Sequence, residues 1–255
     1  MVSPLTDGVD LLSLDAGNTV IFLDHARIAS FLASHGHRVD AEVLIRTEGI
    51  AKRLQETGEL LDLPWPERAA PGARGWGAML GTTLARAGVD EDRVLDLLPL
   101  LWKEHISLNL YSRVPPGLGP ALDEIRALGV HVVIVSNSEG MLEELFTRLG
   151  ILQHFDAVID SGKLGIEKPD PRIFEAALGR FGVSPSRSLH LGDTYATDVV
   201  GALAAGMRAA LIDPFGHYES RLAEVPRVAG VVEAAQAISE ARRASVAECR
   251  TTTSS

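Results

Sequence analysis

The stretch LDAGNTVIFLD spans residues 14–24 and continues an apolar run that starts at Leu11. A short apolar run of this kind is typical of a strand that is buried on both faces. The run stops at the carboxylate of Asp15, and Gly17 marks a turn directly afterwards. The stretch therefore predicts a buried strand over Leu11–Leu14 that delivers an acidic side chain to the edge of a sheet.

The chain after this strand changes pattern twice. From residue 23 to 112, apolar residues recur at spacings of three and four, which predicts helices. Beyond residue 113, short β-branched runs alternate with helical segments, which predicts a parallel sheet with helices on both faces. The runs that predict further strands are VHVVIVSN (130–137), FDAVI (155–159), SLHL (188–191) and RAALI (208–212).

These patterns predict an α/β protein with two parts. The first is a doubly wound, Rossmann-like parallel sheet core, formed by residues 1–22 and 113–240. The second is an all-helical cap domain, residues 23–112, inserted after the first strand. The polar end of the chain, residues 241–255, is expected to be disordered.

Composition narrows the classes of function. The formal net charge of -10 argues against nucleic-acid and anionic-membrane partners. A single cysteine, Cys249, excludes a disulfide within the chain, and no apolar run reaches the length of a membrane span. The first residues lack the layout of a signal peptide. We therefore expect a cytoplasmic protein, a monomer or homodimer, that acts on a small molecule.

Polar residues follow the predicted strands one after another. In a doubly wound sheet, ligands bind outside the carboxyl ends of the strands, so these residues are expected to converge. Each alone is also common in turns and helix caps, but their occurrence at successive strand ends favours a shared site. They are Asp15, Ser136, Asn137, Asp160, Ser161, Lys168, Asp193 and Asp198.

This set of residue types indicates phosphoryl chemistry. Clustered carboxylates repel one another and need a cation, and hard oxygen ligands favour Mg²⁺, which commonly binds a substrate phosphate as well. A lysine and a hydroxyl group can hold the phosphoryl oxygens. One carboxylate then remains free to act as a nucleophile that forms an acyl-phosphate.

Four stretches resemble, in order, the motifs of the haloacid dehalogenase-like (HAD) hydrolase superfamily. They are LSLDAGNTV, VVIVSNS, GIEKPDPRIF and LHLGDTYATDVVGA. The helical insertion after the first motif resembles the type 1 cap of that superfamily. The resemblance covers the chain from about Leu11 to Ile212 and is far more specific for the fold than for the substrate.

The resemblance implies a role for each matching residue. Asp15 would be the nucleophile and Lys168 its partner in catalysis. Ser136 would bind the phosphoryl group, with Asn137 beside it. The Mg²⁺ ligands would be Asp15, the carbonyl of Gly17, Asp193 and Asp198, the last as a direct ligand or as support for one.

Gly17 departs from the pattern of phosphatases in this superfamily, which carry a second aspartate two residues after the nucleophile. That residue acts as general acid and base, and such catalysis contributes about 10²–10⁴-fold. We therefore predict Mg²⁺-dependent hydrolysis of a phosphate ester that is slow unless another residue, such as Asp24 or His25, replaces the missing carboxylate.

Three alternatives remain open at this point. One is a haloacid dehalogenase, although retention of both Asp193 and Asp198 counts against a metal-independent enzyme. Another is a phosphonatase, with Lys52 as a candidate for Schiff-base formation. The last is a binding protein with weak catalysis on the same fold. The stretch LPWPERAAPGARGWG (63–77) is a candidate specificity loop, through Trp65, Arg68, Arg74 and Trp76.

Overall fold

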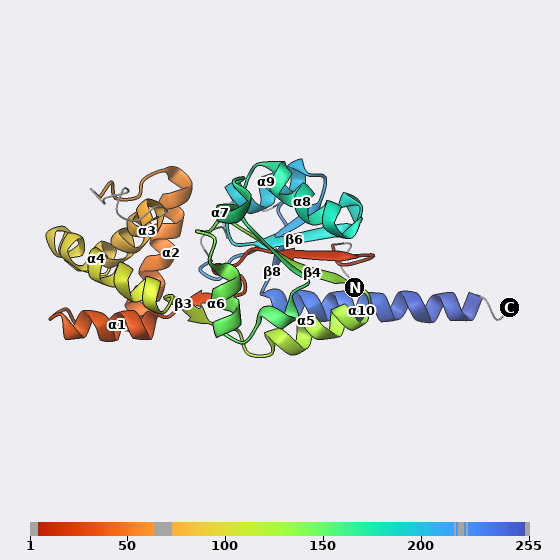
Figure 1. The fold of residues 1–255 in the computed structure, drawn as a ribbon, viewed down its shortest axis with the longest axis horizontal. Coiled ribbons are helices and arrows are strands. Elements are labelled where there is room, and N and C mark those ends of the chain that lie inside the picture. The colour runs from red at the N-terminus through yellow and green to blue at the C-terminus, as the bar shows by residue number, and fades with distance from the viewer. Residues whose placement is uncertain (1–4, 64–72, 217, 219–221, 223, 253–255) are drawn as a thin grey trace. The chain divides into compact units, whose positions relative to one another are not determined.

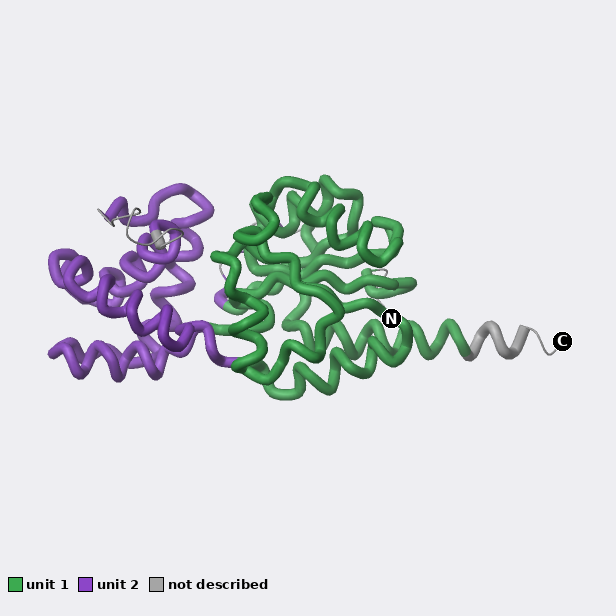
Figure 2. The backbone as a smooth tube through the Cα atoms, viewed as in Figure 1, with its two compact units in different colours: residues 1–22, 114–214, 223–255 green, residues 23–113, 215–222 purple. Residues whose placement is uncertain are grey.

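A computed structural model describes residues 5–63, 73–216, 218, 222 and 224–252. The chain divides into two compact units (Figure 2). The core unit consists of residues 1–22, 114–214 and 223–255, and the helical unit of residues 23–113 and 215–222. The chain thus leaves the core after its first strand and returns to it after an insertion.

The core unit is built on a parallel sheet of six strands in the order β5-β4-β1-β6-β7-β8 (Figure 1). This confirms the predicted doubly wound parallel sheet. The strands are β1 (Leu11–Leu14), β4 (His131–Ser136), β5 (Ala157–Asp160), β6 (Ser188–Gly192), β7 (Arg208–Ile212) and β8 (Arg227–Val228).

Strand β1 lies in the middle of this sheet, between β4 and β6. Leu14 pairs with Ile134 on one side and with Leu191 on the other. All three side chains are fully buried. A strand covered on both faces and paired on both edges has no polar surface, which explains its continuous apolar run.

Helices cover both faces of the sheet (Figure 1). On one face α5 (Leu118–Ala127) packs against α10 (Val231–Thr252), and on the other α8 (Pro171–Phe181) packs against α9 (Val200–Ala204). The shorter elements of this unit are α6 (Leu142–Arg148), α7 (Ser161–Leu164) and three turns, η1 (Leu152–His154), η2 (Pro185–Arg187) and η3 (Tyr195–Val199).

Helix α10 continues to Thr252, through most of the segment that the polar composition led us to expect as disordered. Tertiary contacts explain the first part of this extension. Ala241 is buried, and the Arg242 guanidinium donates to the carbonyl oxygen of Val9 at 2.7 Å and pairs with Asp10. Packing of one helix face can sustain a helix whose composition alone does not favour order.

The helical unit holds α1 (His25–Ser34), α2 (Ala41–Thr57), α3 (Ala73–Arg86) and α4 (Glu91–Ser107). The chain enters and leaves the helical unit through a two-stranded sheet formed by β2 (Phe22–Leu23) and β3 (Tyr111–Arg113). The unit has its own apolar core, which includes Leu32, Leu44, Leu84, Leu98 and Leu101. Within the described part of the chain, no helix is long and apolar enough to cross a membrane.

Only part of the candidate specificity loop can be located. Trp65 and Arg68 lie outside the described residues. Arg74 is exposed, with its guanidinium 3.7 Å from the Asp62 carboxylate. Trp76 is packed within the helical unit, where its ring centroid lies 5.0 Å from that of Trp102.

His105 gives the helical unit a testable pH dependence. Its ring is buried and stacks on Trp102, and burial lowers its pKa from 6.5 to about 4, with Arg27 acting in the same direction. The folded protein therefore keeps this ring neutral, whereas the unfolded chain protonates it below pH 6.5.

We expect His105 to make the free energy of unfolding decrease as the pH falls from 6.5 to 4 and to add no further loss below that. The slope from this one group reaches at most about 1.4 kcal/mol per pH unit. Urea unfolding of the wild type and of a His105→Gln variant, which has no titratable ring, measures the difference. Parallel pH profiles for the two proteins would contradict the expectation.

Candidate functional site

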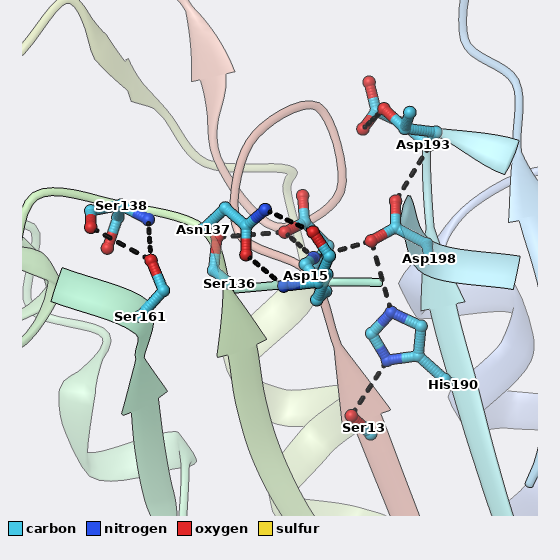
Figure 3. A network of polar contacts seen from close by, with 11 residues as sticks. Ser13, Asp15, Ser136, Asn137, Ser138, Ser161, His190, Asp193 and Asp198 are labelled. Atoms are coloured by element: carbon cyan, nitrogen blue, oxygen red, sulfur yellow. Dashed lines mark hydrogen bonds and ion pairs between the residues drawn. The ribbon is translucent and has the colours of Figure 1, made fainter. Parts of the chain in front are cut away.

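Three neighbouring strands bring polar residues to one edge of the core sheet (Figure 3). Asp15 follows β1, Ser136 ends β4 and Asp193 follows β6. These strands are adjacent and parallel, so their carboxyl ends lie side by side. Asp15, Ser136 and Asp193 therefore lie at neighbouring strand ends within the core unit.

Asp15 is the central carboxylate of this cluster. Its Oδ1 atom accepts a hydrogen bond from Ser136 Oγ at 2.9 Å and another from Lys168 Nζ at 2.6 Å. Its backbone N–H donates to the carbonyl oxygen of Leu191 on β6 at 2.9 Å, which continues the ladder beyond β1. Burial raises the pKa of Asp15 to about 6, although Lys168 acts in the opposite direction.

Lys168 connects two of the acids. Its ammonium group donates to Asp15 Oδ1 and to Asp198 Oδ1, both at 2.6 Å, and its side chain is 3% exposed. Burial alone would lower the pKa of Lys168, but the two carboxylates outweigh it and raise that pKa. The ammonium group is therefore charged at every physiological pH.

Asp198 lies on η3, a turn of π-helix that precedes α9. Its Oδ2 atom accepts a hydrogen bond from the Thr194 N–H at 2.9 Å. Gly192 makes this approach possible, because a Cβ atom there would lie 2.2 Å from Asp198 Cγ. Burial would raise the pKa of Asp198, but Lys168 and then His190 hold it below its usual range.

The loop after Asp15 turns tightly around one carbonyl group. The oxygen of Ala16 accepts hydrogen bonds from the N–H groups of Val20 and Ile21, both at 3.0 Å. In this loop Asn18 has the left-handed backbone conformation, with φ of 53°. Gly17 does not have a positive φ. Backbone conformation therefore does not require glycine at position 17.

The side chain of Asn137 is engaged with the backbone of Lys168. Its Oδ1 atom accepts a hydrogen bond from the Lys168 N–H at 2.8 Å, and its Nδ2 group donates to the Lys168 carbonyl at 3.0 Å. The resemblance placed Asn137 beside the phosphoryl group, but both ends of its amide group already have partners within the protein.

Asp160 and Ser161, at the end of β5, support the neighbouring loop. Asp160 Oδ1 accepts hydrogen bonds from the N–H groups of Gly140 and Gly162, both at 3.0 Å. Ser161 Oγ accepts from the Ser138 N–H at 3.1 Å (Figure 3). These two residues therefore hold the segment after β4 in place, and neither contacts Asp15 in the interactions described.

Sequence reasoning missed His190, which lies within β6 and is fully buried. Its Nδ1 atom shares a hydrogen bond of 2.9 Å with Ser13 Oγ on β1, and its Nε2 atom lies 3.5 Å from Asp198 Oδ1 (Figure 3). Burial lowers the pKa of His190, which favours the neutral ring. The available hint was a pair of polar residues, Ser13 and His190, inside two otherwise apolar strands.

The three acids form a set that suits a divalent cation. One carboxylate oxygen each from Asp15, Asp193 and Asp198 lie within 4.8 Å of one another, and all three residues are buried. Carboxylate oxygens are the ligands that Mg²⁺ prefers. The single ammonium of Lys168 does not balance three carboxylates, so the donor set fits a hard cation in both chemistry and charge.

The residues considered as substitutes for a second aspartate lie at the start of the helical unit. The Asp24 side chain caps α1 by accepting a hydrogen bond from the Arg27 N–H at 3.0 Å. His25 Nε2 lies 2.6 Å from Glu48 Oε2 in a buried pair. Lys52 lies on α2 of the same unit. Asp24 and His25 therefore already have partners within their own unit.

Comparisons with known proteins identify the family to which the chain belongs. The haloacid dehalogenase-like hydrolase family matches residues 9–206. Haloacid dehalogenase-like hydrolase domain-containing protein 3 of Mus musculus is 35% identical over 137 residues, which cover 54% of this chain and 55% of that protein. Phosphoserine phosphatase of Thermus thermophilus is 33% identical over 162 residues, which cover 60% of this chain and 64% of the enzyme. The chain thus spans less than two thirds of the length of these two relatives.

Solved structures share the fold. The HAD-hydrolase YfnB from Bacillus subtilis, in a magnesium-bound form, superposes with a TM-score of 0.58 at 15% identity, covering 86% of this chain and 94% of that one. Since the family match extends over well more than half of the sequence, the chain belongs to the haloacid dehalogenase-like hydrolases.

The buried position of Lys168 predicts a large effect of its removal. In a Lys168→Met variant, the buried carboxylates of Asp15 and Asp198 would lose the ammonium group that pairs with both of them, and breaking such a pair costs about 3–5 kcal/mol. We expect this loss of unfolding free energy in the presence of EDTA and a partial recovery with excess Mg²⁺, because a cation held by these acids would stabilise the folded state. Urea unfolding under both conditions measures it.

Lys163→Met is a matched control, because Lys163 forms an exposed ion pair with Glu143 that water largely replaces. Its stability should change little, with or without Mg²⁺. Equal effects of the two substitutions would contradict the assignment of Lys168 as the charge that holds the acidic cluster together.

Proposed function

We propose that this protein is a Mg²⁺-dependent hydrolase of small phosphate monoesters that acts through an aspartyl-phosphate on Asp15. One observation carries the proposal. The Asp15 carboxylate is held by Lys168 and Ser136, with two further buried acids in the same cluster. The name of the Thermus thermophilus relative, a phosphoserine phosphatase, supports the same reaction class.

The cation would be held by Asp15, Asp193 and the Gly17 carbonyl, with Asp198 as a ligand or as support for one. When bound, Mg²⁺ supplies positive charge that neutralises the acids and polarises the phosphoryl oxygens. The remaining chemistry belongs to the side chains. Asp15 acts in its ionised form, which predominates at neutral pH with a pKa of about 6.

An oxygen of the Asp15 carboxylate donates an electron pair to phosphorus and forms the new P–O bond, while the P–O bond to the alcohol breaks. Ser136 Oγ and Lys168 Nζ, which both donate to Asp15 Oδ1, would hold the phosphoryl oxygens. Water then adds to phosphorus, which releases inorganic phosphate and regenerates the Asp15 carboxylate.

The departing alcohol oxygen has no protonating side chain at position 17, because glycine stands where phosphatases of this family carry an aspartate. The alcohol must then take its proton from water or from the substrate itself. Leaving groups of low basicity, such as aryl oxides, need this proton least. We therefore propose that alkyl esters are hydrolysed slowly.

The reaction class is tested by assaying aryl phosphate, alkyl phosphate and 2-chloropropionate, each with Mg²⁺ and with EDTA. We expect release of phosphate that requires Mg²⁺, is fastest for the aryl ester and is abolished by Asp15→Asn. Chloride release that persists in EDTA would instead identify a dehalogenase. Tight binding of a phosphate ester without turnover would identify a binding protein.

The role of position 17 is tested separately by Gly17→Asp, with Gly17→Asn as the control of equal size that cannot act as an acid. Since φ at position 17 is not positive, we expect both variants to fold. Turnover of alkyl phosphates should rise about tenfold to a hundredfold in Gly17→Asp alone, with a smaller gain for aryl phosphates. A folded, Mg²⁺-binding aspartate variant without any gain would reject the missing acid as the limit on rate.

A further inference from the structure

Lys168 occupies an unusual place for a residue that must be held accurately. It lies in the connection between α7 and α8, outside any helix or strand. Its four-carbon side chain is flexible, and fixing it in one rotamer costs about 2 kcal/mol in conformational entropy. Yet its Nζ atom lies 2.6 Å from both Asp15 and Asp198. Something must fix the backbone from which this side chain extends.

Asn137 supplies that constraint. Its amide group accepts a hydrogen bond from the N–H of Lys168 at 2.8 Å and donates one to the carbonyl of the same residue at 3.0 Å. This two-way pairing imitates the contact that a neighbouring strand would make. Asn137 directly follows Ser136 at the end of β4, so the pairing ties the Lys168 loop to the sheet that carries the site.

We infer that Asn137 is a positioning residue that acts through Lys168, and that its side chain does not bind the substrate. Only an amide of this length donates and accepts at once in this geometry. Aspartate would keep the bond from the Lys168 N–H but lose the donor to the Lys168 carbonyl. Alanine would lose both bonds and free the loop.

The competing assignment is direct contact between the Asn137 amide and the phosphoryl group, as the resemblance to the family implied. Both assignments predict that Asn137→Ala slows catalysis, by about 10²-fold if a displacement near 1 Å results. Loss of activity therefore does not distinguish them. The distinction lies in whether the effect of Asn137 depends on Lys168.

The first measurement is the reactivity of the Lys168 amine toward N-hydroxysuccinimide acetate, followed by mass spectrometry of each lysine. In the wild type, a side chain that is 3% exposed should react slowly. We expect labelling to accelerate severalfold in Asn137→Ala and to a smaller extent in Asn137→Asp. Lys163, which is exposed in every variant, is the internal standard.

Ser138→Ala is the matched control variant. Ser138 is the next residue along the same loop, and its Oγ atom has no hydrogen-bond partner among the described residues. Its removal should leave the labelling of Lys168 unchanged. If Asn137→Ala also leaves that labelling unchanged, the inference is wrong, whatever reaction the protein catalyses.

The second measurement rests on the proposed function and uses orthovanadate with excess Mg²⁺ as the probe in calorimetric titrations. Asn137→Ala and Lys168→Ala should each weaken binding. The double variant should bind no more than about twofold more weakly than Lys168→Ala, because the two residues act as one unit. If the reduction in vanadate affinity in the double variant instead equals the product of the two single reductions, Asn137 makes a contact of its own with the phosphoryl group. That result would overturn the inference.

The two measurements fail independently. If vanadate does not bind the wild type with Mg²⁺ and phosphate esters are not hydrolysed, the proposed function is wrong. The labelling experiment still decides whether Asn137 holds Lys168, since it requires neither substrate nor metal.

Discussion

One buried ammonium group between two carboxylates is the interaction on which the site depends. Lys168 lies 2.6 Å from both Asp15 and Asp198, and water is almost excluded from all three side chains. Any one of them buried alone would cost several kcal/mol, so each stays charged only because the others are present. Yet Asp193 belongs to the same cluster, and one lysine cannot balance three acids. Charge balance therefore favours a further cation, which would stabilise the core unit as well as assist the chemistry.

Contacts to backbone groups hold these charges in place. The Asp198 carboxylate is bound by the Thr194 N–H and has room to approach because Gly192 lacks a Cβ atom. The Lys168 backbone is bound by the Asn137 amide. Backbone groups move less than side chains, so these contacts fix the separation between the charged groups before any ligand binds. Such preorganisation is what stabilisation of charge in a transition state requires.

Sequence reasoning could locate the charged residues of the site but not their supports. Apolar runs that end in acids or hydroxyl groups identify strand ends, and the geometry of parallel sheets then brings Asp15, Ser136 and Asp193 together. Asn137 could not be interpreted in this way, because an amide can pair with any polar group and its partner lies 31 residues away. Helix α10 continues past residue 241 for a similar reason. The composition there is polar, but contacts such as that of Arg242 with Val9 are visible only in three dimensions.

The loop after β1 distinguishes two explanations for a glycine two residues after Asp15, the nucleophile that we propose. A left-handed backbone would explain Gly17 by conformation, but that conformation belongs to Asn18, with φ of 53°. An aspartate at position 17 would meet no such strain. Glycine there thus removes an acid without any need imposed by φ, while the acids that surround Lys168 are kept. Under the proposed function, the site would hold the groups that stabilise a phosphoryl group and would lack the one that protonates the leaving alcohol. A substrate suited to such a site is one whose leaving group departs without a proton.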